Sequence, residues 1–148
     1  NHEELSCLVG VYEYFNNLFQ HHFPGEDGSV REKIEKVNEL INKHEQEIAN
    51  PLLKYINSRD DIKLIGKDKI ENKNRAPTIA FTMNNKSSKE LSSDLVKKGI
   101  ATRNDNFYAW RCLKALGIDV DDGVVRTSMV HYNTHEDVNN LIEALKKI

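Results

Sequence analysis

Helical periodicity governs the first part of the chain. Apolar residues recur every three or four positions up to Pro24–Gly25, a pair that ends helices. A second periodic segment starts after Ser29, which forms a capping box with Glu32, and it would be about 45 Å long if it ran unbroken to Ser58. Pro51 stands inside that segment and is expected to kink or interrupt it. The pattern therefore predicts two long helices before any strand.

Shorter elements fill the remainder of the chain. Runs rich in β-branched and alternating residues predict strands over 61–67, 75–83, 100–103 and 124–130. Polar caps followed by apolar periodicity predict helices after Ser87 and after Thr134. Residues 109–116 are expected to form a further helix.

This order of elements predicts an α+β fold, an α/β sandwich in which a small mixed sheet carries helices on one face. The two long helices precede the sheet. We expect residues 1–60 to form leading helices that act as a connector, and residues 61–148 to form the small α+β domain.

Arg126 is the polar residue that the strand pattern singles out. Alternation places it on one face of its strand with Val124 and Ser128, while Val125 and Thr127 take the other face. Val130 lies on the same face as Arg126, and an arginine in line with two valines is not expected to be wholly solvated. Its guanidinium is a planar fork of fixed charge that can hold a carboxylate through two parallel hydrogen bonds. The alternative role is that of an ordinary surface or salt-bridged arginine.

Composition excludes several classes of partner. With 21 Lys+Arg against 23 Asp+Glu, the net charge of −2 gives no electrostatic reason to expect nucleic acid or an anionic membrane. No apolar run reaches the roughly 20 residues that span a bilayer, so a soluble, cytoplasmic protein is expected. The strings HEELS and HEDVN lack the second histidine of a zinc motif, so no metal site is expected. Cys7 and Cys112 are expected to be small buried hydrophobes.

Three stretches resemble one known family. The run VVRTSMVHYNTHEDVNNLIEAL (124–145), with RAPTIAFT (75–82) and NFYAW (106–110), is similar to the C-terminal small domain of class V aminotransferases of PLP fold type I, in particular the cysteine desulfurase and selenocysteine lyase-like branch. The resemblance implies that Arg126, ahead of a YNT motif, holds the carboxylate of an amino-acid substrate. It also implies that Arg103, Asn106 and Tyr108 line the cleft facing the cofactor.

The chain departs from the desulfurase pattern at one position. Aligning Arg103 with the family's loop arginine puts Tyr108 where true desulfurases carry the nucleophilic cysteine. A phenol with an ordinary pKa near 10 is neutral at neutral pH and cannot replace a thiolate. We therefore expect no catalytic residue on this chain.

The cofactor chemistry of the family requires groups that this chain does not show in its sequence. Pyridoxal 5′-phosphate (PLP) needs a covalently bound lysine, an acid at the pyridine nitrogen and donors for the phosphate. Fold type I enzymes keep these groups on a large domain, and this chain has neither a Ser-x-His-Lys-like context nor a glycine-rich phosphate loop. The resemblance thus implies part of a PLP-dependent desulfurase, lyase or aminotransferase-like enzyme, inactive without its large domain and dimeric when intact.

Two alternatives remain open at the level of sequence. The chain could be a non-enzymatic α+β module that binds a small ligand or a protein, or a small domain that complements a separately encoded large domain. The chain opens on Asn1 rather than methionine, so we expect it to continue upstream. The gene ahead of Asn1 distinguishes the enzyme from the module, because a frame that continues into a cofactor-binding large domain supports the enzyme and a start codon just ahead of Asn1 supports the module. A separately encoded large domain would instead be detected by co-purification.

The absence of a cofactor lysine gives the first testable prediction. When PLP is added to the isolated chain, we expect no absorbance band that borohydride removes and that maps to one lysine. Peptide mapping after reduction measures this, and a single modified lysine would contradict the prediction.

Overall fold

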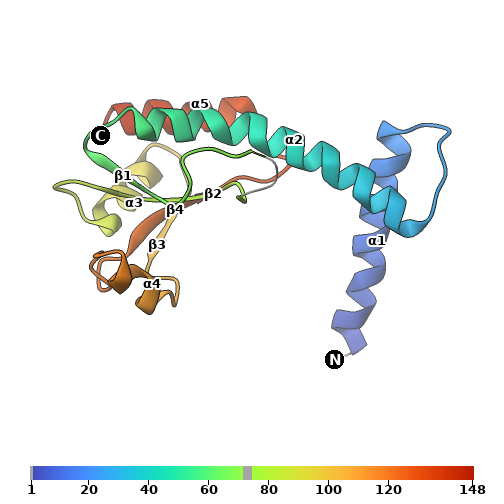
Figure 1. The fold of residues 1–148 in the computed structure, drawn as a ribbon, viewed down its shortest axis with the longest axis horizontal. Coiled ribbons are helices and arrows are strands. Elements are labelled where there is room, and N and C mark those ends of the chain that lie inside the picture. Colours follow the sequence, from blue (N-terminus) through green and yellow to red (C-terminus); the bar gives the residue numbers. More distant parts are fainter. Residues whose placement is uncertain (1, 72–74) are drawn as a thin grey trace. The chain divides into compact units, whose positions relative to one another are not determined.

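The computed structural model describes residues 2–71 and 75–148, and Asn1 lies outside the described residues (Figure 1). The chain divides into two compact units, Asn1–His44 and Glu45–Ile148. In chain order the described elements are α1 (His2–His22), α2 (Val30–Asn57), β1 (Ile62–Ile65), β2 (Thr78–Met83), α3 (Ser88–Lys97), β3 (Arg103–Asp105), α4 (Trp110–Ala115), β4 (Val124–Ser128) and α5 (His135–Lys146).

The first unit consists of α1 and the beginning of α2. Phe19 of α1 is buried, and Lys33 of α2 lies over its ring with Nζ 5.5 Å from the centroid. The Ser29–Glu32 capping box forms, because the Ser29 amide donates to Glu32 Oε2 at 2.7 Å and the Glu32 amide to Ser29 Oγ at 3.3 Å. The prediction of two long leading helices is confirmed.

α2 continues through Pro51 to Asn57, so the expected interruption does not occur. Proline removes one backbone donor from a helix and crowds the preceding turn. Burial of the turn that follows Pro51 offsets this cost. Leu52, Leu53 and Ile56 in that part of α2 are almost completely buried. The last turns of α2 are therefore held by the core of the second unit rather than by local propensity.

The second unit is built on a four-stranded sheet with the order β1-β2-β4-β3. All three pairings are antiparallel, so the prediction of a mixed sheet is wrong in that detail. β2 and β3, which flank helix α3 in sequence, do run parallel, but β4 inserts between them. Because β4 lies between them, the parallel strands β2 and β3 are not hydrogen-bonded to each other.

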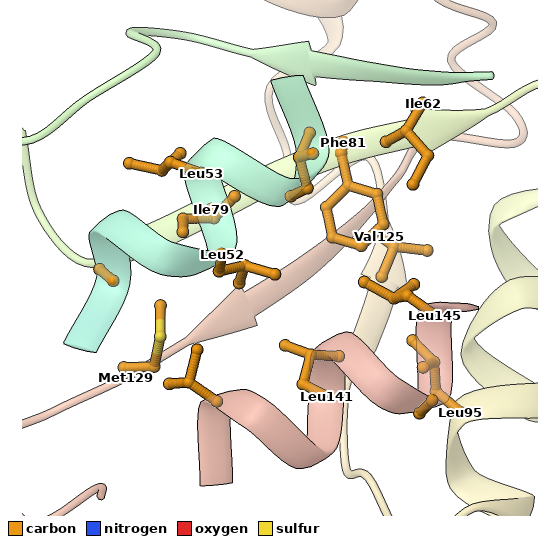
Figure 2. Close-up of a cluster of buried hydrophobic side chains, with 14 of the residues drawn as sticks. Leu52, Leu53, Ile62, Ile79, Phe81, Leu95, Val125, Met129, Leu141 and Leu145 are labelled. Carbon is orange, nitrogen blue, oxygen red and sulfur yellow. The ribbon is translucent and has the colours of Figure 1, made fainter. Parts of the chain in front are cut away.

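One face of the sheet carries the hydrophobic core. Ile79 and Phe81 of β2 and Val125 of β4 are fully buried there, and the register pairs Phe81 with Val125. Leu52 of α2 and Leu145 of α5 pack into the same cluster (Figure 2), as do side chains of α3. The α+β fold with helices on one face of the sheet is thus confirmed.

The predicted caps order two of these helices. Thr134 and Asp137 form a capping box at the start of α5, and Ser87 and Glu90 form one at the start of α3. The backbone amide of Thr134 donates to the Asp137 carboxylate at 2.8 Å, and this hydrogen bond lowers the pKa of Asp137 below its usual value.

The third strand starts later than its hydrophobic pattern predicts. Residues 100–102 are not in a strand, and β3 begins only at Arg103. Gly99 has φ +80°, and the Ile100 amide bonds back to Leu95 O at 3.0 Å. The chain is still closing the end of α3 at this point, so Ile100 packs against the core from a turn.

Two further findings bear on the sequence predictions. Cys7 and Cys112 are exposed, so the expectation that both are buried is wrong. Each lies on a solvent-facing position of its helix, where a thiol needs no apolar neighbours. In the part of the chain that the structure describes, no helix is both long and apolar enough to cross a bilayer.

Gly123 holds the end of β3 close to the start of β4. Its φ is +74°, and a Cβ at this position would lie 2.3 Å from the carbonyl carbon of Asp105. Only glycine combines this backbone conformation with such a close approach. The loop that follows β3 therefore starts, at Asn106, in close contact with the backbone of Gly123 just before β4.

Core packing predicts a contrast between two leucines of the second unit. Leu91 is fully buried and Leu116 is 45% exposed. We expect Leu91→Ala to lower the free energy of unfolding by about 2–5 kcal/mol and Leu116→Ala to change it by less than about 1 kcal/mol. Urea denaturation followed by circular dichroism measures both, and equal losses would contradict the described core.

The close approach at Gly123 predicts a second contrast. Gly117 also has positive φ (+68°), but nothing lies within 4 Å of a Cβ built there. We expect Gly117→Ala to cost about 1–2 kcal/mol from backbone strain alone, and Gly123→Ala to cost more because the Asp105 backbone must also move. In ¹⁵N spectra, Gly123→Ala should shift the amides of 105–109. Unchanged amides there would contradict the approach.

Candidate functional site: two arginines on the open face of the sheet

Arg103 and Arg126 are directly opposite each other on neighbouring strands. The β3–β4 register pairs them, and the β2–β4 register pairs Arg126 with Ala80 on its other side. Directly paired residues of antiparallel strands project to the same face. This face is the one turned away from the core, because the neighbouring residues Val125 and Thr127 are buried on the core side.

We call this surface the arginine face. It consists of the strand residues that alternate with the core positions, namely Lys63, Ile65, Thr78, Ala80, Thr82, Arg103, Asp105, Val124, Arg126 and Ser128. Arg126 is half-buried and Arg103 is exposed. The expectation that Arg126 is not wholly solvated is confirmed.

Positive charge exceeds negative charge on the arginine face, where Lys63, Arg103 and Arg126 share the surface with the carboxylate of Asp105. Neither Arg103 nor Arg126 has a carboxylate partner in residues 2–71 and 75–148. Asp105 lies on the same face, but its Oδ1 accepts the Asn106 amide at 2.7 Å. Like charges directly opposite in a sheet repel each other, so an anion bound between these two side chains would relieve the repulsion.

Phe107 supplies the contact that the structure gives the Arg126 side chain. The guanidinium carbon Cζ lies 3.9 Å from the centroid of the ring. An atom this close above a ring is in van der Waals contact with it, and the guanidinium must turn one face to the ring, because a nitrogen pointing at the ring would overlap its carbons. The cation therefore lies against the electron-rich face of the ring. One face of the guanidinium is therefore covered by an apolar surface.

The loop after β3 turns in an uncommon conformation. Phe107 and Tyr108 have φ values of +50° and +60°, and the Ala109 amide donates to Asn106 O at 2.9 Å. These features match a type I′ turn, which usually has asparagine or glycine at its two central positions. Asn106 stabilises the turn: its Oδ1 accepts the Tyr108 amide at 3.0 Å, and its Nδ2 donates to Val120 O at 3.3 Å.

The turn sends its two aromatic side chains to different environments. Phe107 is half-buried against Arg126, whereas Tyr108 is 98% exposed. The sequence-predicted residues thus separate into two groups. Arg103 and Arg126 are neighbours on the sheet, while Asn106 shapes the loop beside them and Tyr108 projects from that loop into solvent.

Two residues of this site were not predicted from the sequence. Phe107 is not a strand residue, so alternation assigns it no face, and its type is unusual for the turn it occupies. Gly123 stands directly before a strand, which is a signal that a glycine has a backbone role. That signal does not reveal which segment approaches it.

The lysine of the arginine face lies away from the two arginines. On the arginine face the lysine is Lys63, and it lies on β1, the edge strand farthest from β3. The arginines therefore have no neighbouring strand lysine that could bond covalently to the cofactor. Among residues 2–71 and 75–148, no group of three or more His, Cys, Asp or Glu side chains is arranged to hold a metal ion.

Comparison with known proteins identifies relatives of this chain. The model of the aminotransferase class-V family matches residues 32–141. An aminotransferase-like protein of Gibberella zeae is 35% identical over 112 residues, which are 74% of this chain and 28% of the relative. A cysteine desulfurase of Escherichia coli O8 is 29% identical over 108 residues, covering 73% of this chain and 25% of that protein.

A solved structure has the same fold. The apo structure of a cysteine desulfurase from Thermococcus onnurineus NA1 superimposes with a TM-score of 0.64 at 20% sequence identity, over 80% of this chain and 29% of that one. The chain spans only about a quarter of the length of the curated relatives it matches. On the strength of the family match and the shared fold, this chain belongs to the class V aminotransferase family.

Proposed function

We propose that this chain is the C-terminal small domain of a PLP-dependent, cysteine desulfurase-like enzyme, and that Arg126 holds the carboxylate of its amino-acid substrate. The observation that supports this role is the arginine pair on the open face of the sheet. Its positive charge has no carboxylate partner within the described residues, and the guanidinium of Arg126 is held against a ring rather than by an acid.

The geometry of Arg126 suits a carboxylate. The guanidinium edge carries N–H donors at the spacing of two carboxylate oxygens, and the covered face of the group directs a ligand toward that edge. Arg126 is half-buried, so its charge is less screened than that of a fully solvated arginine. Arg103 adds a second positive charge one strand away and raises the local attraction for an anion.

The loop residues take supporting roles in this proposal. Asn106 fixes the turn through its two side-chain hydrogen bonds. Tyr108, exposed at the position of the desulfurase cysteine, presents a phenol toward the cleft. Because a neutral phenol does not attack sulfur as a thiolate does, we expect no catalytic nucleophile on this chain.

The cofactor in this proposal belongs to the rest of the enzyme. PLP, held by a large domain, would supply the electron sink for chemistry at the substrate α-carbon. This chain would bind and orient the substrate, and it would not react without the large domain. We further propose a cytoplasmic enzyme in which the complete polypeptide forms a homodimer.

Substitution of Arg126 tests this role in the complete polypeptide that contains the chain. Removing one member of a partly buried, hydrogen-bonded charge pair costs about 2–5 kcal/mol, so we expect Arg126→Gln to lower kcat/KM for the amino-acid substrate by about 30- to 5,000-fold. Arg126→Lys keeps the charge but loses the planar fork, and its activity should fall between that of the wild type and the glutamine variant.

Ser128 provides the matched control, because it lies two residues farther along the same strand face. Ser128→Ala should leave kcat/KM within about twofold of the wild type. If Arg126→Gln has no larger effect than Ser128→Ala, the proposed carboxylate site is wrong. A reading frame without any cofactor-bearing domain, together with no co-purifying large domain, would instead favour a non-enzymatic binding module.

A further inference from the structure

We infer that Phe107 is a positioning residue that orients the Arg126 guanidinium for an anion approaching in the plane of the group. The inference deepens the proposed function and rests on it for the identity of the anion. The contact between Phe107 and Arg126 can be tested without reference to that function, because both residues belong to the second unit of this chain.

The Arg126 guanidinium holds one orientation only if a neighbouring residue restricts the rotation of its side chain. An arginine has several rotatable bonds and about 2 kcal/mol of rotamer entropy. Within residues 2–71 and 75–148, no hydrogen bond or ion pair fixes its guanidinium, and the interaction present is the ring at 3.9 Å. Phe107 therefore determines which direction the donors of Arg126 face.

The backbone around Phe107 is held in a conformation that delivers this ring. Two consecutive non-glycine residues at positive φ cost free energy. That cost is offset by the Asn106 hydrogen bonds to the Tyr108 amide and to Val120 O. At the other end of the turn, the glycine at position 123 lets the Asp105 backbone lie against β4. Asn106 and Gly123 thus stabilise a turn of unfavourable backbone conformation, and this turn places the Phe107 ring against Arg126.

The ring has a consequence for what Arg126 binds. With one guanidinium face covered, stacking of a planar ligand on that side is blocked. The N–H edge stays available for a carboxylate that lies in the plane of the group. Phe107 would therefore favour ligands held edge-on over ligands held by stacking.

An NMR measurement on the 148-residue chain tests the positioning directly and without ligand. The ring current of Phe107 should shift the Arg126 side-chain proton resonances upfield in the wild type. Phe107→Leu should abolish this shift and raise the mobility of the Arg126 Nε–Hε group, while Phe107→Trp should retain both the shift and the order. Leucine and phenylalanine incur similar backbone strain at positive φ, so the comparison isolates the ring.

Trp110→Leu is the matched control, because it removes a nearby, 55% exposed aromatic residue that makes no described contact with Arg126. It should leave the Arg126 resonances unchanged. An unshifted, mobile Arg126 in the wild-type chain would overturn the inference, even if Phe107→Leu fails to fold. A shift lost equally in Trp110→Leu would also overturn it.

Kinetics of the complete polypeptide separate this inference from the proposed function. If Phe107 orients Arg126, Phe107→Leu should raise KM for the amino-acid substrate by about threefold to tenfold, and Phe107→Trp should restore it. A merely structural role would lower the active fraction, and hence the apparent kcat, with KM unchanged. If the NMR contact is present but Arg126→Gln leaves kcat/KM unchanged, the proposed function fails while the positioning stands.

Discussion

The alternation of side chains along β4 is the constraint on which this structure depends. Successive residues of a strand point to opposite faces, so burying Val125 and Thr127 against the helices obliges Arg126 to emerge on the other side. A slip of one residue in the register would bury the guanidinium in the core and expose Val125. Core packing therefore positions the candidate functional residue as strictly as any contact of its own.

Charge placement gives the arginine face its chemical character. Arg59, in the turn between α2 and β1, is paired with an acid, because it donates hydrogen bonds of 2.7 and 2.6 Å to the Asp61 carboxylate. Arg126 is instead held by the ring of Phe107. A cation held by an apolar surface keeps its donors available for a ligand. Arg59 and Arg126 therefore differ within one unit: an acid holds the first, and an aromatic ring lies against the second.

The sequence predicts the elements of this fold better than their detailed pairing. Local signals sufficed for the caps at Ser87 and Thr134 and for the two faces of β4, because hydrogen bonds and periodicity within a few residues determine them. The insertion of β4 between β2 and β3 depends on contacts between distant segments, which local pattern does not encode. Pro51 shows the same limit, since tertiary burial of Leu52 and Leu53 overrides the local preference.

The candidate site divides along similar lines. Arg126 is identifiable from alternation together with a family-like motif, and its cross-strand position beside Arg103 follows once the register is known. The role of Phe107 is not identifiable in this way, because an aromatic residue at positive φ contradicts the usual turn preferences. Its contact with Arg126 depends on the Gly123 approach and on Asn106. Such exceptions to local preference concentrate at functional sites.

The most direct test of this account is a crystal structure of the complete polypeptide with an amino-acid ligand bound. The account predicts both carboxylate oxygens of the ligand at hydrogen-bonding distance, about 2.7–2.9 Å, from the Arg126 guanidinium, with the Phe107 ring still against its face. A ligand carboxylate held by other residues, with Arg126 paired to an acid of another domain, would contradict it.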